Sequence, residues 1–189
     1  MVKAAVEYNL GAHVHHYCFL DFEAFERFID AIGGVEVTLP TALVDPAFPT
    51  RDYGAIPIRI PAGQQRLTGE QALWFARSRY QSSDFARMHR QQQLVLAVRA
   101  RLLRLEMLPR LPEVWAEQGN LVQTDMSLAQ VLQLASDAWT IPEEQITART
   151  LELGYVYRGA VPGDPFVLFP DRARIRQLVA ELFPDPPGR

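Results

Sequence analysis

The feature that most constrains the fold is a long helical segment in the middle of the chain whose apolar face continues into charged residues. From Asp84 to about Leu105 the residues follow the period of one α-helix, and Ser82 or Ser83 is placed to cap its first turn. Apolar residues at helical spacing predict its buried face: Leu94, Val95, Val98, Leu102 and Leu105. Stepping back along that face by threes and fours leads to Gln91, Arg87 and Asp84, with Arg90 beside them.

Arginine and aspartate are rarely buried without a partner, so charged residues on a buried face need an explanation. One explanation is that the first turns of the helix protrude into solvent. The other is an anion site, because Arg77 and Arg79 end the preceding helix and a short turn would bring them against Arg87 and Arg90. Guanidinium groups bind phosphate in a bidentate manner, and a helix N-terminus adds positive potential. A diphosphate would balance these cations, and Asp84 would orient them or take part in the chemistry.

Length and composition predict one globular domain over residues 1–189, with a frayed tail at 184–189. The 189 residues are 48% hydrophobic and 22% charged, which is enough for one sizeable core. The net charge of −3 argues against a general nucleic-acid binder, so the basic cluster is a local feature. No apolar run reaches membrane-spanning length, and no signal peptide is visible.

Helical and strand patterns alternate along the chain, which predicts an α/β fold. Asp21 and a capping box at Thr68–Gln71 mark the starts of two helices, and Gly11 and Gly33-Gly34 mark the ends of two. With the apolar spacing, these signals predict helices at 2–10, 22–32, 69–79, 84–105, around 113–118, 128–139 and 172–183. Strands are predicted at 17–20, 35–39, 56–60, 147–153 and 166–169, and a loop at 41–55. The glycine patterns of P-loop and Rossmann proteins and the G-x-S-x-G nucleophile elbow do not occur.

Histidine and cysteine give no metal site that we would assign. On a strand, His13 and His15 would share one face while His16 takes the other, without a fourth ligand nearby. Cys18 is the single cysteine, so no intrachain disulfide can form, and its apolar neighbours predict a buried structural thiol. Asp45 and Asp52 fall in the predicted loop, where exposed acids are the simpler interpretation.

An ordered series of motifs runs along most of the chain. The series begins with Ile29-Asp30-Ala31-Ile32-Gly33-Gly34-Val35 and continues with Leu67-Thr68-Gly69-Glu70-Gln71. It then reaches Arg77-Ser78-Arg79, and its most specific part is Asp84-Phe85-Ala86-Arg87 followed by Arg90-Gln91-Gln92. The last motifs are Thr124-Asp125-Met126-Ser127 and Leu168-Phe169-Pro170-Asp171. In this order the motifs resemble the LytR–CpsA–Psr family of bacterial cell-envelope enzymes.

The resemblance implies an α/β/α layered sandwich with a central mixed sheet. It also implies a phosphotransferase that moves a glycopolymer, such as a teichoic acid or capsule, from a polyprenyl-diphosphate carrier to peptidoglycan. The product would be a phosphodiester, made at the extracytoplasmic face of the bacterial membrane. The alternative is a non-catalytic module that binds a polyprenyl diphosphate or another anion and regulates envelope biogenesis.

By the same resemblance, individual residues receive expected roles. Diphosphate binding is expected of Arg77, Arg79, Arg87, Arg90 and Gln91, and a catalytic role of Arg79, Asp84 and Arg87. The lipid tail would lie beside Leu94, Val95 and Val98, for which simple core packing is the competing role. The family implies Mg²⁺, with ligands, membrane anchor and further core strands in an N-terminal half that would precede this chain. The sequence is therefore expected to be the C-terminal part of the domain, and we assign no metal ligand within it.

Overall fold

The computed structural model describes residues 2–80, 83–104, 122–161 and 163–183, and it consists of two compact units. One unit comprises Met1–Tyr17 with Glu143–Arg189, and the other comprises Cys18–Pro142. Leu105, Ser82, the short helix expected around 113–118 and the tail at 184–189 lie outside the described residues. The expectation of a single domain stays a prediction.

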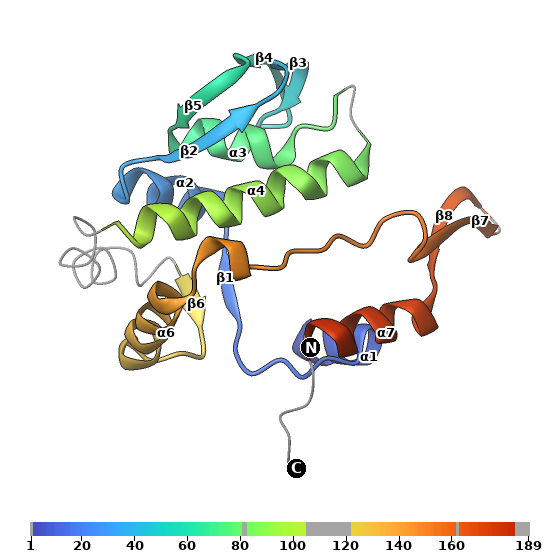
Figure 1. The fold of residues 1–189 in the computed structure, drawn as a ribbon. Coiled ribbons are helices and arrows are strands. Elements are labelled where there is room, and N and C mark those ends of the chain that lie inside the picture. The colour runs from blue at the N-terminus through green and yellow to red at the C-terminus, as the bar shows by residue number, and fades with distance from the viewer. Residues whose placement is uncertain (1, 81–82, 105–121, 162, 184–189) are drawn as a thin grey trace. The chain divides into compact units, whose positions relative to one another are not determined.

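The unit Cys18–Pro142 contains the long helix and most of the buried core. Its elements are β1 (Cys18–Leu20), α2 (Phe22–Ala31), β2 (Val35–Leu39), β3 (Leu43–Pro49), β4 (Ala55–Ile60), β5 (Gly63–Leu67), α3 (Gly69–Arg77), α4 (Asp84–Leu102), β6 (Val122–Thr124) and α6 (Leu128–Thr140). Among the helices of this unit, α2, α3 and α4 pack together beside strand β2 (Figure 1).

Local sequence signals fix the boundaries of these helices. The Asp21 carboxylate caps α2 by accepting a hydrogen bond of 2.8 Å from the Ala24 amide. Gly33 and Gly34 end that helix with φ angles of 79° and 81°, a region that side chains rarely adopt. Helix α3 begins with a capping box between Thr68 and Gln71, as predicted.

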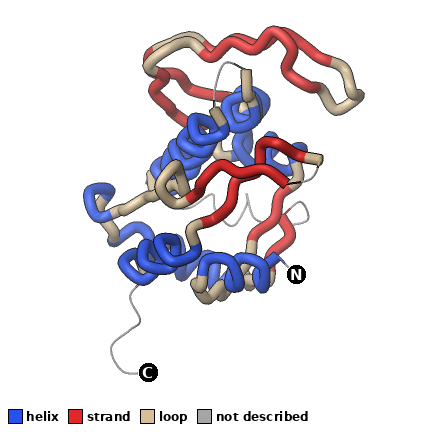
Figure 2. The backbone as a smooth tube through the Cα atoms, turned by 90° about the vertical axis from the view of Figure 1, so that its right-hand side faces the viewer, coloured by secondary structure: helices blue, strands red, loops and turns tan. Residues whose placement is uncertain are grey.

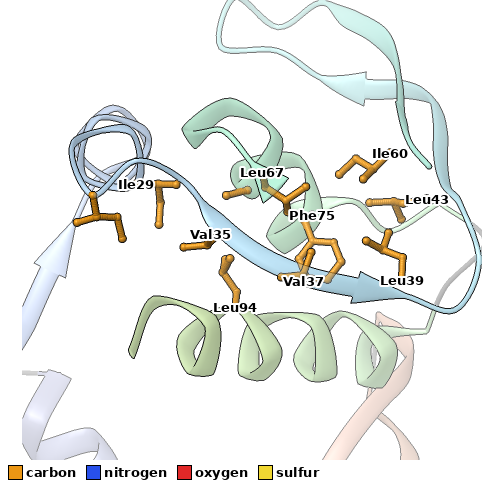
Figure 3. Close-up of a cluster of buried hydrophobic side chains, with 11 residues drawn as sticks. Ile29, Val35, Val37, Leu39, Leu43, Ile60, Leu67, Phe75 and Leu94 are labelled. Carbon is orange, nitrogen blue, oxygen red and sulfur yellow. The ribbon is translucent and has the colours of Figure 1, made fainter. Parts of the chain in front are cut away.

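The core lies between strand β2 and helices α2, α3 and α4 (Figure 3). Along β2, Val35, Val37 and Leu39 are buried while the residues between them are exposed, which confirms the predicted half-buried strand. Phe75 of α3 and Leu94 of α4 pack onto the same cluster. Burial of this apolar surface is the main term that holds α4 against the unit.

The strands pair two by two, and every pairing is antiparallel. The pairs are β1 with β6, β2 with β5, β3 with β4, and β7 with β8. Figure 2 shows these strands as red segments among the blue helices. The α/β class is confirmed, but the expected central mixed sheet is not formed among the described residues, because each strand has a hydrogen-bonded neighbour on one side only.

The expected loop at 41–55 is wrong, because most of it forms the β3–β4 hairpin. Pro46 and Pro49 suggested a loop, since proline cannot donate a ladder hydrogen bond. The hairpin accommodates Pro46 in a register irregularity between Asp45 and Phe48. Strand β5 was not predicted from the sequence either, since its residues Gly63–Leu67 are mostly polar and their alternation is weak.

Among its described residues, the unit Met1–Tyr17 with Glu143–Arg189 contains two α-helices in contact and one hairpin. Its elements are α1 (Val2–Leu10), the short helix η2 (Glu143–Gln145), β7 (Val156–Val161), β8 (Asp164–Pro170) and α7 (Arg172–Leu182). The expected strand at 147–153 is not formed, and only Leu153 makes an isolated bridge to Val156. Gly11 ends α1 with a φ of 73°, as the sequence predicted.

Two burial predictions in the unit Cys18–Pro142 are also wrong. Cys18 is exposed, because no residue of the three-residue strand β1 is fully buried. Val95 is 67% exposed, because the buried face of α4 is centred on Leu94 and Val98 and is too narrow to include it. No helix in the described part of the chain is long and apolar enough to span a bilayer.

Candidate functional site

The basic cluster predicted from the sequence lies where α3 ends and α4 begins. Helix α3 delivers Arg77 at its last position, and Ser78 follows in an extended conformation with a ψ of 134°. Ser83 caps α4 by accepting a hydrogen bond of 3.1 Å from the Ala86 amide, so the capping prediction is confirmed. The expectation that Arg79 also belongs to this helix is wrong, because α3 ends at Arg77 and Arg79 follows it. The two helix ends bring Arg79 near Arg87 of α4.

Asp84 joins one arginine from each side of this junction. The Asp84 Oδ1 atom lies 3.5 Å from Nε of Arg79 and 3.2 Å from an Nη atom of Arg87. The side chains of Arg79 and Asp84 are largely exposed, whereas Arg87 is mostly covered. Two guanidinium groups thus share one carboxylate at an accessible surface, and together the three groups carry a net positive charge.

Arg77 is held by aromatic rings. Its guanidinium carbon lies 4.1 Å from the centre of the Phe22 ring and 5.3 Å from that of Phe48. Both distances are in the range of cation–π attraction, and stacking on a ring restricts the plane of the guanidinium group. Neither phenylalanine was predicted to act here, because the sequence gives no sign that β3 and α2 flank this arginine.

The side chains of Arg90 and Gln91 donate hydrogen bonds to carbonyl groups at the C-terminal end of α3. Arg90 Nε donates to the Phe75 carbonyl at 2.8 Å, and an Nη atom of Arg90 donates to the Ser78 carbonyl. Gln91 Nε2 donates to the Ala76 carbonyl at 3.2 Å. The last carbonyls of a helix lack partners within the helix, so these side chains cap α3. Burial lowers the pKa of the Arg90 guanidinium from its ordinary value, and the negative end of the α3 dipole favours its charge.

A buried carboxylate lies beside the junction. Asp45 of β3 is 5% exposed and accepts a hydrogen bond of 2.7 Å from the hydroxyl group of Ser78, which is 1% exposed. The interpretation of Asp45 as an exposed loop acid is therefore wrong, whereas Asp52 is exposed as expected. Alternation could have revealed the strand, because Leu43 and Asp45 share one face, but Pro46 obscured it.

The predicted site residues fall into three groups. Arg79, Asp84 and Arg87 lie together, Arg77 stacks on aromatic rings, and Arg90 and Gln91 bond to α3. Of the residues expected beside a lipid tail, Leu94 is in the core, Val98 packs against it and Val95 is exposed. Their roles toward a diphosphate or a lipid stay predictions.

The carboxylates near the junction already have partners within the protein, which bears on the Mg²⁺ ion that the family resemblance implies. Asp84 faces two arginines, and Asp45 accepts from Ser78 and, at 3.1 Å, from the Ala47 amide. No group of three or more His, Cys, Asp or Glu side chains suited to a metal ion occurs in the ranges that the structure describes. These residues alone do not fit a Mg²⁺ site.

Curated relatives of the chain include a protein named as a teichoic acid transferase and one named as a regulatory protein. The chain is 34% identical over 125 residues to a protein of Oceanobacillus iheyensis named polyisoprenyl-teichoic acid–peptidoglycan teichoic acid transferase TagU, covering 65% of this chain and 36% of the relative. It is 24% identical over 160 residues to regulatory protein MsrR of Staphylococcus aureus, covering 83% and 46%. The chain thus spans between about a third and a half of the length of these relatives.

Solved structures with the same fold include two from Bacillus subtilis. TagV superposes with a TM-score of 0.73 at 22% identity, covering 95% of this chain and 68% of that one. TagU superposes with a TM-score of 0.65 at 20% identity, covering 95% and 68%. The model of the LytR–CpsA–Psr (LytR_cpsA_psr) family matches residues 1–181, so this chain belongs to that family.

Proposed function

We propose that the chain is part of a phosphotransferase that moves a glycopolymer from a polyprenyl-diphosphate carrier to peptidoglycan at the extracytoplasmic face of the membrane. Family membership and the similarity to a relative named as a teichoic acid transferase support this proposal. The observation that carries it is the pair of guanidinium groups of Arg79 and Arg87 on one exposed carboxylate, with Arg77 two residues before Arg79 in the chain.

The charges at this junction suit a diphosphate. Asp84 offsets one of the two positive charges beside it, and Arg77 adds another on a side chain fixed by aromatic rings. A diphosphate carries several negative charges and many acceptor oxygens, so it can bind two guanidinium groups at once. In this proposal Arg77, Arg79 and Arg87 contact the phosphates, while Arg90 and Gln91 hold the end of α3 that presents them.

Phosphoryl transfer depends on positioning and on charge stabilisation. The acceptor hydroxyl oxygen of peptidoglycan would bond to the phosphorus next to the glycan. The bond from that phosphorus to the bridging oxygen would break, the hydroxyl proton would be released, and polyprenyl phosphate would leave. Negative charge grows on the leaving phosphate, where guanidinium groups stabilise it. Asp84 would keep Arg79 and Arg87 close together before the substrate arrives.

A binding experiment tests the site. Geranylgeranyl diphosphate would be titrated into the wild type and into the Arg79→Ala and Arg87→Ala variants by isothermal calorimetry. Each variant is expected to bind at least about tenfold more weakly, since hydrogen bonds to charged groups are worth roughly 1.5–3 kcal/mol. Arg27→Ala is the control, because Arg27 lies on α2 and pairs with Glu23. Unchanged affinity in both site variants would overturn the proposal.

Two further experiments test the role of the diphosphate group and the presence of transferase activity. Geranylgeranyl monophosphate should bind more weakly than the diphosphate, whereas equal binding would assign the affinity to the lipid chain. Transfer of a labelled glycopolymer to peptidoglycan, assayed with Mg²⁺ and with the N-terminal half that the family resemblance implies restored, separates an enzyme from a binding module. Diphosphate binding without transfer would favour the non-catalytic module, a role in keeping with the name of the regulatory relative.

A further inference from the structure

The end of α3 is tied to strand β3 by a buried polar pair that the diphosphate site does not use. We propose that Asp45 and Ser78 are positioning residues, which fix the directions of Arg77 and Arg79 through the Asp45–Ser78 hydrogen bond. This inference rests on the proposed function, because it concerns how the same arginines are held for a diphosphate. It assigns a role to two residues that contact neither the substrate nor the reacting atoms.

The pair is unusual for a buried strand position. Asp45 is inward-facing on β3, between the buried residues Leu43 and Phe48. Burying a carboxylate costs free energy unless hydrogen bonds compensate it, and an apolar residue of similar size is often at least as stabilising. The carboxylate instead accepts from the Ser78 hydroxyl at 2.7 Å and from the Ala47 amide at 3.1 Å. Such a pair defines one geometry, which an apolar contact does not.

Ser78 is held at all of its polar groups. Its amide donates to the Trp74 carbonyl at 2.9 Å, its hydroxyl donates to Asp45, and its carbonyl accepts from Arg90. These partners belong to α3, β3 and α4, so the residue is fixed from three elements. Arg77 and Arg79 are its two chain neighbours, and their backbone directions are therefore fixed as well.

Because of the register irregularity in β3, two residues of this strand contact the end of α3: Asp45 contacts Ser78, and Phe48 contacts Arg77. The register shifts between Asp45 and Phe48, so that both side chains are buried although they are three residues apart. Asp45 then bonds Ser78, and the Phe48 ring lies under the Arg77 guanidinium. With Ser78 buried between them, Arg77 is directed to the aromatic rings and Arg79 to Asp84. Preorganised side chains lose less conformational entropy when a ligand binds.

The test compares Ser78→Ala, Asp45→Ala and Asp45→Asn in the full chain. Ser78→Ala removes only a hydroxyl group, so it is the least disruptive change. Asn at position 45 keeps groups that can bond both partners, because a serine hydroxyl can also accept. Ser78→Ala and Asp45→Ala are expected to weaken geranylgeranyl diphosphate binding by roughly three- to tenfold, the size of one lost hydrogen bond. Asp45→Asn should stay within about twofold of the wild type, and the double alanine variant should be no weaker than the weaker single.

A matched control separates positioning from loss of stability. Thr68→Ala removes the N-terminal cap of α3, at the opposite end of the helix from Arg77. It should lower the midpoint of urea unfolding as Ser78→Ala does, but leave the diphosphate affinity unchanged. Equal weakening of binding in Thr68→Ala would overturn the inference, since the affinity would then follow helix stability alone.

A second readout needs no ligand. The Nε–Hε signals of arginine side chains can be followed by ¹⁵N NMR, and the Arg77 signal should carry a ring-current shift from Phe22 and Phe48. Ser78→Ala should move the signals of Arg77 and Arg79 and leave that of Arg27 in place. If these signals move while the wild type does not bind the probe, the proposed function fails and the positioning role stands. Unmoved signals would refute the positioning role even if the probe binds.

Discussion

Arg90 offers the sharpest test of how this junction is built, because the family resemblance assigns it to the diphosphate whereas its contacts are with the protein. The perturbation is Arg90→Met, which keeps an unbranched apolar stem and removes the guanidinium group. In the structure that group donates to the carbonyls of Phe75 and Ser78 at the end of α3. The substitution therefore leaves two carbonyl groups in a partly buried place without their donors.

The magnitude follows from these two hydrogen bonds. Each has a charged donor, and such bonds are worth roughly 1.5–3 kcal/mol, with a further contribution of about 0.3–1 kcal/mol from a cation near a helix C-terminus. Water can reach part of the site and replace some of this, so we expect a loss of about 2–4 kcal/mol in the free energy of unfolding. Urea unfolding followed by circular dichroism measures it. Arg27→Met, at an exposed pair on α2, should change the value by less than about 0.5 kcal/mol.

One result would refute this reasoning. If Arg90→Met unfolds at the wild-type urea concentration but loses geranylgeranyl diphosphate binding, Arg90 acts on the ligand and the capping of α3 is incidental. A stability loss that is accompanied by a modest loss of affinity is the expected outcome, because α3 ends with Arg77 and Arg79 follows it directly after Ser78.

Three other predictions concern the core, a helix contact and the charge at the site. Leu94→Ala should destabilise by about 2–5 kcal/mol in urea unfolding, whereas the exposed Val95→Ala should cost less than about 0.5 kcal/mol; equal effects would contradict the assigned face of α4. Gly69→Ala should cost about 1–3 kcal/mol or prevent folding, because its Cβ would lie 2.1 Å from the Glu26 carbonyl oxygen. Asp84→Asn should tighten diphosphate binding by about fivefold at low salt, since a unit charge near 4 Å in water is worth about 1 kcal/mol, and this gain should fall as salt is added; weaker binding would show that Asp84 acts mainly by orienting Arg79 and Arg87.

Much of the fold could be predicted because its signals are local. The caps at Asp21, Thr68 and Ser83 each depend on side chains within three residues, and the structure confirms all of them. The alternation in 35–39 and the spacing of α4 likewise report burial through a single period. Family membership rested on several such motifs in order, so it did not depend on any one of them.

The rest could not be predicted because it depends on contacts between distant segments. Asp45 lies 33 residues before Ser78, and nothing in either neighbourhood indicates the other. Pro46 suggested a loop where an irregular strand carries it. Phe22 lies more than 50 residues before Arg77 in the sequence, yet its ring stacks on the Arg77 guanidinium group. Such pairings follow from the packing of elements, which a periodic pattern does not encode.

The sequence allowed two explanations for the charged residues of α4: the first turns protrude into solvent, or the cations form an anion site. The junction has features of both. Asp84 and Gln91 are exposed, whereas Arg87 and Arg90 are partly covered. The positive charges have partners within the protein: Arg90 meets the negative end of α3, Arg77 meets two rings, and Arg79 and Arg87 meet Asp84. An anion is therefore not required for the junction to fold. A diphosphate would compete only with Asp84, the weakest and most solvated of these partners, so the arginines that it would bind are those whose release costs least.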